Sequence, residues 1–231
     1  MTQPRVAIIT GAFGALGSTL ARSAAQQGFR VALIDRTTER RTQAWEGAEP
    51  LILGGVDLAS ATEAQKARDA IVERYGAVDV LFNVAGAFKW ETIEDGEPDT
   101  LEQMFRANVQ TTFNCSRAVT ADLKRSAAGR IANVGAYAAL SATAGMGPYA
   151  ASKAAVHQLT HAMACELGAS GVTVNAVLPS IIDTPANRAA MPDADTSTWV
   201  PTHTLAAAML LLASESAHVV SGALIPVTLA R

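Results

Sequence analysis

Residues 10–17 read Thr10-Gly11-Ala12-Phe13-Gly14-Ala15-Leu16-Gly17, and they lie between an apolar β-branched run and an alanine-rich helical pattern. Glycines at this spacing let the backbone turn tightly and approach a pyrophosphate, and the last glycine lets the helix pack against the strand. The free N–H groups at the helix N-terminus favour bound phosphate. This strand–turn–helix arrangement predicts a dinucleotide-binding site near the start of the chain.

Short apolar runs alternate with helical patterns along the rest of the chain. Strands are expected at residues 5–10, 30–34, 51–56, 78–84, 130–135, 172–177 and 223–227, and helices at 15–28, 60–75, 100–125, 148–168 and 202–214. Continuous apolar strands separated by helices are typical of a parallel sheet covered on both faces. The sequence predicts a single domain over residues 1–231. We expect a Rossmann-type, doubly wound α/β fold with a seven-stranded, mostly parallel sheet and helices on both faces.

The composition restricts the class of protein. The chain has 231 residues, of which 49% are hydrophobic, and 18 basic against 21 acidic side chains give a net charge of −3. This balance excludes a disordered chain and argues against nucleic acid or a membrane surface as a partner. Cys115 and Cys165 have no disulfide or metal-ligand spacing, and both are expected to be buried. We recognise no secretory signal and expect a cytoplasmic protein.

Asp35 ends the second predicted strand, about 20 residues after the glycine turn. A carboxylate there can accept hydrogen bonds from the adenosine ribose and would repel a 2′-phosphate. Phe13, inside the turn, supplies no cation to offset that repulsion. The sequence therefore favours NAD over NADP, although Arg36 could bind a phosphate. The alternative is that Asp35 only caps the following turn.

Tyr149 and Lys153 are spaced i, i+4 in a helical pattern and so share one helical face. A phenol with an unperturbed pKa of about 10 is a poor acid–base catalyst at neutral pH. A neighbouring ammonium is expected to lower that pKa and to hydrogen-bond a ribose. This pair predicts general acid catalysis by Tyr149 with help from Lys153.

Two long polar segments, residues 87–99 and 180–201, each follow a predicted strand. Ligands of open α/β sheets bind at the carboxyl ends of the strands, so these segments are expected to wall a substrate pocket. Their few large apolar side chains are the candidates for its lining, and residues 180–201 are expected to close over the substrate. Ordinary surface loops are the alternative. The lining candidates are Phe88, Trp90, Met191 and Trp199.

The chain resembles the short-chain dehydrogenase/reductase family over nearly its whole length. The matching features are the 10–17 turn, Asp57-Leu58, the 83–86 turn, Asn108, the Tyr149/Lys153 pair and Pro179 to Thr184. The resemblance implies an oxidoreductase that transfers a hydride between a nicotinamide cofactor and a small acceptor. It also implies a homodimer or homotetramer formed through the helices at residues 100–125 and 148–168.

The same resemblance implies roles for individual residues. Tyr149 matches the family's general acid, Lys153 orients the ribose, and Asn108 helps to hold a proton-relay water at a helix kink; these three are the expected catalytic group. No metal is expected, because His157 and His161 have no third ligand nearby and are expected to pack at the surface or a subunit interface. The expected cofactor contacts are Gly11, Phe13, Gly14, Ala15, Leu16, Gly17, Asp35, Arg36, Asp57, Leu58, Asn83, Ala85, Gly86, Lys153, Pro179, Ile182 and Thr184.

One position departs from the family pattern. Thirteen residues before the tyrosine, the family has a serine that hydrogen-bonds the substrate carbonyl, and this chain has Ala136. Losing such a donor typically costs about 3 kcal/mol of transition-state stabilisation. Ser141 or Thr143 could replace it, although nothing in the sequence positions them. Either carbonyl reduction is weak, or the acceptor does not need that donor.

A narrower group within the family, the dihydropteridine reductases, also lacks this serine and keeps the Tyr/Lys pair. The chain is similar to that group at residues 14–18, 135–140, 183–188, 191–195 and 221–225 and at Trp199, whereas Asn108 suits the wider family better. The resemblance implies NADH as cofactor and a quinonoid dihydropterin as acceptor. Two other hypotheses are a cofactor-binding regulator or sensor without turnover and a structural subunit, and the retained Tyr149 and Lys153 argue against both.

Overall fold

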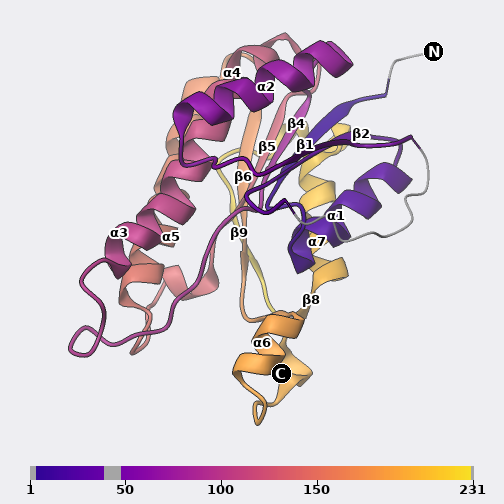
Figure 1. Ribbon diagram of the computed structural model, residues 1–231. Helices are drawn as coiled ribbons and strands as arrows, with labels where there is room; N and C mark the ends of the chain where they lie inside the picture. Colours follow the sequence, from indigo (N-terminus) through magenta and orange to yellow (C-terminus); the bar gives the residue numbers. More distant parts are fainter. Residues whose placement is uncertain (1–3, 39–47, 230–231) are drawn as a thin grey trace.

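The computed structural model describes residues 4–38 and 48–229, and its centre is a seven-stranded sheet with the order β3-β2-β1-β4-β5-β6-β9 (Figure 1). Every neighbouring pair of strands is parallel, so the predicted doubly wound α/β fold is confirmed. The strands are β1 (Val6–Thr10), β2 (Arg30–Asp35), β3 (Leu51–Gly54), β4 (Val80–Asn83), β5 (Arg130–Val134), β6 (Thr173–Pro179) and β9 (Leu224–Val227).

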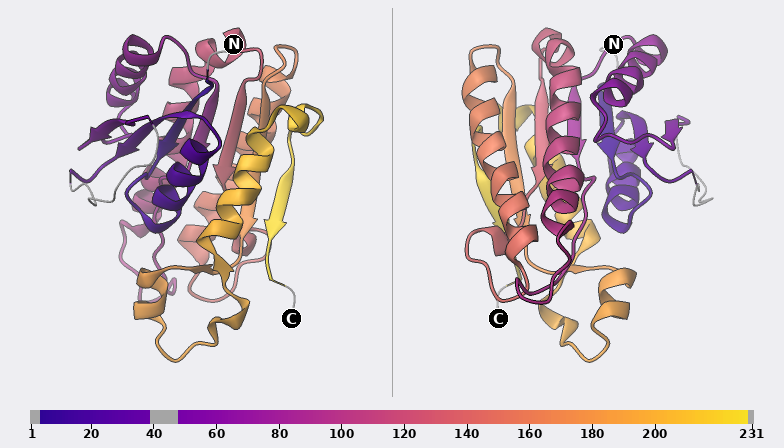
Figure 2. Two further views of the ribbon diagram at one scale, coloured as in Figure 1. Left: turned by 90° about the vertical axis from the view of Figure 1, so that its right-hand side faces the viewer. Right: turned by 60° about the vertical axis from the view of Figure 1, so that its left-hand side comes forward.

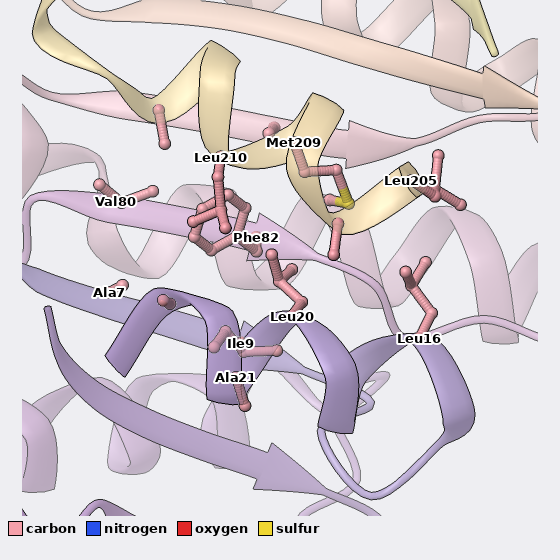
Figure 3. Packing of buried hydrophobic residues seen from close by; sticks show 14 of the residues in the cluster. Ala7, Ile9, Leu16, Leu20, Ala21, Val80, Phe82, Leu205, Met209 and Leu210 are labelled. Carbon is pink, nitrogen blue, oxygen red and sulfur yellow. The ribbon is translucent and has the colours of Figure 1, made fainter. Parts of the chain in front are cut away.

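Helices cover both faces of the sheet because successive strand residues point to opposite sides. On one face, Ala7 and Ile9 of β1 pack in a cluster with α1 (Ala15–Gln26) and α7 (Thr202–Ala213) (Figure 3). On the other face, Val6 and Ile8 belong to a second cluster that includes side chains of three helices. These helices are α2 (Ala61–Tyr75), α4 (Thr111–Arg125) and α5 (Gly147–Gly168).

The single helix expected at residues 100–125 is interrupted. It consists of α3 (Thr100–Met104), a π-helical segment η1 (Phe105–Gln110) and α4. Inside this helix the Thr112 hydroxyl donates to the carbonyl of Asn108 at 2.8 Å, a contact that competes with regular helix bonds. The widened turn places Asn108, fully buried, against the neighbouring strand end.

Residues 180–201 form short elements rather than a plain loop. They include β7 (Ile182–Asp183), α6 (Pro185–Ala190), a 3₁₀ turn η3 (Thr196–Thr198) and β8 (Val200–Pro201). Thr184 caps α6, with its hydroxyl accepting a hydrogen bond from the amide of Asn187 at 3.1 Å. Figure 2 shows this segment beyond the end of the sheet at which β6 and β9 terminate, which is the edge where the expected substrate pocket would lie.

The two cysteines differ in their surroundings. Cys115 is buried, and burial raises the pKa of its thiol to about 12. Cys165 is exposed on α5, so the prediction that both cysteines are buried is wrong for this one. Within residues 4–38 and 48–229, none of the helices has the length and apolar character that crossing a bilayer requires.

Candidate active site at the carboxyl edge of the sheet

The glycine turn follows β1 at the point where the connection of the sheet reverses between β1 and β4. Gly11 has φ +62°, and a Cβ there would lie 2.9 Å from the Cα of Ala85 in the turn after β4. The hydroxyl of Thr10 accepts hydrogen bonds from the amides of Val84 and Ala85, each at 3.0 Å. The two turns therefore meet closely at the switch point, where ligands of such sheets bind.

The helix that follows the turn is built to leave its first amides available. Gly14 is the N-cap of α1 and makes no side-chain capping bond, and the first turn contains no acidic residue. A Cβ at Gly17 would lie only 2.1 Å from the carbonyl oxygen of Gly11, so only glycine allows this tight packing. Uncapped amides at a helix N-terminus attract phosphate, and this geometry fits the pyrophosphate of a dinucleotide. Leu16 lies in the buried core beneath the turn.

Asp35 lies at the end of β2, beside the glycine turn. One carboxylate oxygen accepts a hydrogen bond from the amide of Phe13 at 2.9 Å. The other oxygen accepts from the amide of Thr37 at 3.0 Å and from its hydroxyl at 3.1 Å. The alternative capping role is therefore present, and the same bonds fix the carboxylate next to the turn. Arg36 is exposed.

Asp57 follows β3 and pairs with Arg106 of η1 across 2.5 Å. Burial would raise the pKa of the Asp57 carboxyl, but hydrogen bonds from Ala59 and Arg106 and the charges of Arg106 and Arg36 hold it below its usual value. Leu58, next in the chain, is buried in the core, so its side chain does not face a ligand. This pair places a carboxylate and a guanidinium at the edge where the cofactor is expected.

The side chain of Asn83 is buried rather than open to a ligand. Its amide nitrogen donates to the oxygen of Asn133 at 2.8 Å and to the hydroxyl of Ser116 at 3.1 Å. Asn133 in turn donates to Thr160 of α5 at 2.9 Å. Asn83 thus joins β4 to β5 and α4, just before the turn that ends at the exposed Gly86.

Lys153, on α5, is buried at the carboxyl end of β5. Its ammonium donates to the carbonyl of Val134 at 2.8 Å, and a Cβ at Gly86 would lie 3.4 Å from the same nitrogen. Burial lowers the pKa of Lys153 to about 8. The glycine after β4 and the lysine of α5 are therefore neighbours, as the predicted ribose site requires.

Tyr149 lies one turn earlier on α5. Its ring meets that of Phe88 edge to face, with centroids 4.9 Å apart and an interplanar angle of 87°. Burial raises the pKa of the Tyr149 phenol to about 12. The sequence analysis expects a lowered pKa for this phenol, whereas burial shifts the pKa in the opposite direction.

Asn108 connects the parts of this site. Its side-chain nitrogen donates to the carbonyl of Ala87 at 3.1 Å and to the hydroxyl of Ser152 at 2.9 Å, and its oxygen accepts from the amide of Ala87 at 2.9 Å. The Ser152 hydroxyl donates to the carbonyl of Tyr149 at 2.7 Å. Asn108 is thus a positioning residue that ties the segment after β4 to the start of α5.

Ala136 is buried at the position where the family has its serine. Its amide donates to Nε2 of His157 at 3.3 Å, so that backbone group is already paired. Burial and the charge of Lys153 lower the pKa of His157, which keeps the imidazole neutral. His157 is buried inside the chain, so the expectation that it packs at the surface or at a subunit interface is wrong. Ser141 and Thr143 both lie in the exposed segment before α5.

The first predicted wall is held against the segment before α5. A Cβ at Gly145 would lie 2.1 Å from the Trp90 indole, and the amide of Glu91 donates to the carbonyl of Gly145 at 2.9 Å. Phe88 and Trp90 are both exposed, at 52% and 59%. This wall therefore carries two large exposed rings, of which Phe88 contacts Tyr149.

The second wall contains the remaining predicted positions. Pro179 is buried at the end of β6, and Ile182 in β7 packs partly against the core. The hydroxyl of Thr184 caps α6. Met191 is half-buried and Trp199 is buried. Sequence reasoning missed two residues near this wall, Tyr137 and Ser180, which line a cavity with Trp199. Only the three-dimensional contact of three separate segments could reveal them.

No cluster of three or more potential metal-ligating side chains occurs among the residues that the structure describes. His157 and His161 are spaced i, i+4 on α5, and they do not belong to a group of three such side chains among the described residues. The groups described at this edge are amides, the carboxylates of Asp35 and Asp57, one phenol and one ammonium. These groups suit a nucleotide cofactor.

Residues 5–195 match the family model described as short chain dehydrogenase. The short-chain reductase protein NovJ of Streptomyces niveus is 37% identical over 193 residues, which cover 80% of this chain and 72% of NovJ. Relatives at this identity and coverage extend over most of the fold described above. The glycine turn, Tyr149 and Lys153 all lie within residues 5–195, the part of the chain that the family model matches.

Two solved structures share the fold at lower identity. ElxO with NADP bound has a TM-score of 0.87 at 22% identity, covering 96% of each chain. Carveol dehydrogenase from Mycobacterium avium in complex with NAD has a TM-score of 0.83 at 23% identity, covering 96% of this chain and 95% of its own. One complex holds NADP and the other NAD, so the likeness establishes the fold and leaves the cofactor preference open.

Replacing Lys153 by methionine is expected to stabilise the protein at neutral pH. The folded-state pKa of about 8 lies below the ordinary value of 10.5, so the unfolded state binds more protons between these values and stability rises with pH across that window. Below pH 8, burial of the charged ammonium lowers the free energy of unfolding by up to about 3 kcal/mol. Its hydrogen bond to the carbonyl of Val134 raises this free energy by about 1 kcal/mol. Urea unfolding of the unchanged protein and of Lys153→Met, at pH values from 6 to 10, measures the difference in stability at neutral pH and the dependence of stability on pH.

The control for this stability measurement is Lys66→Met, at an exposed lysine of α2. The pH profile of this variant should parallel that of the unchanged protein, whereas the profile of Lys153→Met should be flatter. A Lys153→Met protein that is less stable at pH 7 and keeps the full rise toward pH 10 would show that burial does not destabilise this ammonium.

Proposed function

The chain belongs to the short chain dehydrogenase family, and we propose that it is a reductase that uses NADH to reduce a small, electron-poor organic acceptor. The observation that carries this proposal is the buried pair on α5. Tyr149 and Lys153 share one face of the helix, and the Lys153 ammonium lies against Gly86 in the turn after β4. A protein that only bound the cofactor would not need the phenol.

The residues present fit a nicotinamide dinucleotide. The close approach of Gly11 to Ala85 leaves no room for side chains, and the uncapped start of α1 offers amides to the pyrophosphate. Lys153 would hold the nicotinamide ribose, and Thr184 and Ile182 would border it. When bound, this cofactor supplies the hydride. The chain's own residues then position the acceptor, exclude water and deliver the proton.

In the proposed reaction Tyr149 gives the proton. Burial raises the pKa of its phenol to about 12, so the phenol is a weaker acid than usual but is protonated throughout the neutral range. The acceptor gains a hydride at carbon and one proton from the Tyr149 oxygen at nitrogen or oxygen, and solvent then returns a proton to the phenolate. The neighbouring Lys153 ammonium stabilises that phenolate as it forms.

The acceptor we propose needs only one proton donor. Ala136 has no hydroxyl, and its amide is taken by His157 at 3.3 Å, so neither can polarise a carbonyl. A quinonoid ring is already electron-poor and accepts hydride without a second donor. We therefore propose a quinonoid dihydropterin, or a chemically similar conjugated ring, as the substrate class. The exposed rings of Phe88 and Trp90 supply a flat apolar wall for it.

We also propose NADH as the preferred cofactor. The Asp35 carboxylate is fixed by the amides of Phe13 and Thr37, at 2.9 and 3.0 Å, beside the glycine turn. One oxygen keeps an acceptor site for a ribose hydroxyl, and the negative charge repels a 2′-phosphate. Arg36 is exposed and next to Asp35, which offsets this preference only in part.

The quaternary structure is proposed on the exposed apolar side chains of the interrupted helix. Leu101, Phe105 and Phe113 are all more than a third exposed. With α5 beside them, they offer the surface for a homodimer or homotetramer, the association that the resemblance implies. The two free thiols, Cys115 and Cys165, fit the proposed cytoplasmic location.

Substituting Tyr149 by phenylalanine is expected to remove turnover and leave NADH binding intact. Loss of a general acid should lower kcat with NADH and quinonoid dihydropterin by about 10²- to 10⁴-fold. NADH fluorescence titration should give a dissociation constant within twofold of the unchanged protein. Tyr75→Phe, which removes a phenol far from this edge, is the control. Unchanged turnover in Tyr149→Phe would remove Tyr149 from the mechanism, and NADH binding without turnover in the unchanged protein would favour a sensor.

Introducing serine at Ala136 tests the acceptor class. The new hydroxyl is expected to raise kcat/KM for a simple cyclic ketone by about 10- to 100-fold, because it restores a donor to the carbonyl. For quinonoid dihydropterin, kcat/KM should change less than threefold. Ala138→Ser makes the same change two residues along and should affect neither acceptor. Equal gains for both acceptors would mean that the natural reaction also lacks a donor.

The cofactor preference depends on the charge of Asp35. The unchanged protein should have a higher kcat/KM with NADH than with NADPH, and Asp35→Asn should reduce that ratio by about 10-fold or more, since hydrogen bonds to a charged group contribute about 1.5–3 kcal/mol. Initial rates with both cofactors measure the ratio. Asp69→Asn, on the exposed side of α2, loses the same charge elsewhere. An unaltered ratio in Asp35→Asn would assign the preference to another residue.

A further inference from the structure

Three buried polar side chains, Lys153, His157 and Thr160, are spaced i, i+4 and i+7 along one face of α5. Each of them bonds the end of β5 or the residues that follow it. Lys153 belongs to the proposed reaction, and Thr160 binds the side chain of Asn133 within the core. His157, at 3% exposure, has no part in that reaction. An imidazole costs more to bury than an apolar side chain of similar size, so its contacts need a reason.

His157 supplies a hydrogen-bond acceptor where the pairing of β5 with β6 ends. The amide of Gly135 still donates to the carbonyl of Val177 in β6 at 2.9 Å. The next amide, that of Ala136, donates instead to Nε2 of His157 at 3.3 Å. Ala136 is buried, so this amide would lack a partner without the imidazole. His157 therefore fixes the backbone at the point where the chain leaves the sheet.

The backbone that His157 fixes includes the anchor of Lys153. The peptide before Gly135 contains the carbonyl of Val134, to which the Lys153 ammonium donates at 2.8 Å. The peptide after Gly135 contains the amide that His157 binds. Glycine allows more backbone rotation than any other residue, so the two peptides would otherwise be loosely connected. Two side chains one turn apart on α5 hold them both.

Close packing reinforces this hydrogen bond. A Cβ at Gly135 would lie 2.5 Å from Nε2 of His157 and 3.2 Å from Cδ1 of Leu178 in β6, so the position requires a glycine. The imidazole is thus pressed against the backbone that it binds, and it occupies the space that a side chain would need. The flexibility of Gly135 is a consequence of this packing, and the bond to Ala136 limits it.

The hydrogen bond also specifies the state of the imidazole. To accept from the Ala136 amide, Nε2 must carry no proton, so the ring is neutral with its proton on Nδ1. A protonated ring could not accept and would place a second positive charge near the Lys153 ammonium. Burial, and then the charges of Lys153 and His161, lower the pKa of His157 in agreement with a neutral ring.

We propose that His157 is a positioning residue, which fixes the peptides on both sides of Gly135 and thereby the carbonyl that anchors the Lys153 ammonium. This inference rests on the proposed function and deepens it, since Lys153 would hold the nicotinamide ribose from that anchor. The lysine side chain is long and flexible. His157 keeps its ammonium in one place, against Gly86, before a cofactor binds.

Lysine ε-protons report whether the Lys153 side chain is fixed, in protein without cofactor or acceptor. A held side chain gives its two ε-protons different NMR shifts, whereas rapid rotation averages them. The chain contains four lysines, so ¹³C-lysine labelling gives few signals, and Lys153→Met identifies the signal of Lys153. The unchanged protein should show two separated ε-proton shifts for Lys153.

The variants remove, replace or preserve the acceptor. His157→Leu removes it and should merge the two shifts, whereas His157→Gln, whose amide oxygen takes the place of Nε2, should keep them apart. Thr160→Val is the matched control, because it removes another buried hydrogen bond between this face of α5 and β5. His157→Leu and Thr160→Val should both unfold at lower temperature than the unchanged protein. If His157→Leu does not unfold cooperatively, His157→Asn, which is too short to reach Ala136, replaces it.

Kinetics distinguish positioning from a general loss of stability. In NADH fluorescence titration, the dissociation constant should rise about 5- to 10-fold in His157→Leu and stay within twofold in His157→Gln and Thr160→Val. With quinonoid dihydropterin and saturating NADH, kcat of His157→Leu should fall by a similar factor. The KM for this acceptor should stay within twofold, because His157 does not contact it.

The NMR result decides the inference whether or not an acceptor is turned over. Merged ε-proton shifts of Lys153 in the unchanged protein, or separated shifts in His157→Leu, overturn it and leave the reductase proposal intact. Equal changes in Thr160→Val also overturn it, because they assign the effect to packing of α5. The expected NMR changes without turnover of any acceptor support the role of His157 and count against the proposed function.

Discussion

The Thr10 hydroxyl joins the two strands between which the sheet reverses its connection, and the rest of the site depends on that junction. It accepts from the amides of Val84 and Ala85, while Gly11 leaves no space for a Cβ against Ala85. The glycine turn and the turn after β4 are thereby held as one unit. Gly86 at its end then meets Asn108 and Lys153, so a contact at β1 determines where two helices present their side chains.

The site also contains an unfavourable interaction that function explains. A lysine ammonium is buried and paired with one carbonyl, that of Val134, and its pKa falls to about 8 as a result. Structure alone gives no reason to retain such a group, because an apolar side chain would pack there at lower cost. The ribose that we propose for this position would supply further hydrogen bonds and so give that reason. Stability and activity are therefore opposed at Lys153.

Much of the fold could be predicted from the sequence because the signal is local. The strand and helix positions follow from apolar runs and glycine spacing, and the seven-stranded parallel sheet agrees with them. The residue pattern at 100–125 predicts one continuous helix, and only the family resemblance indicates a kink at Asn108, which lies in the π-helical segment and hydrogen-bonds Ala87 and Ser152. The exposed position of Cys165 depends on which face of α5 lies against the sheet, and the nearly uniform apolar character of that helix does not specify it.

The candidate site shows the same difference between features that follow from local sequence and features that depend on tertiary contacts. This difference also concerns the surroundings of a bound acceptor. Tyr149, Lys153 and Gly86 were predictable as motifs, but the cavity that Ser180 and Trp199 line and the desolvation of Tyr149 arise only when distant segments meet. Among those meetings, the Trp90 indole fills the space beside Gly145. The amide of Glu91 also donates to the carbonyl of Gly145, so the wall that carries Phe88 is fixed to the segment just before α5. In the proposed reaction an acceptor at Tyr149 would therefore lie between this fixed wall and residues 180–201.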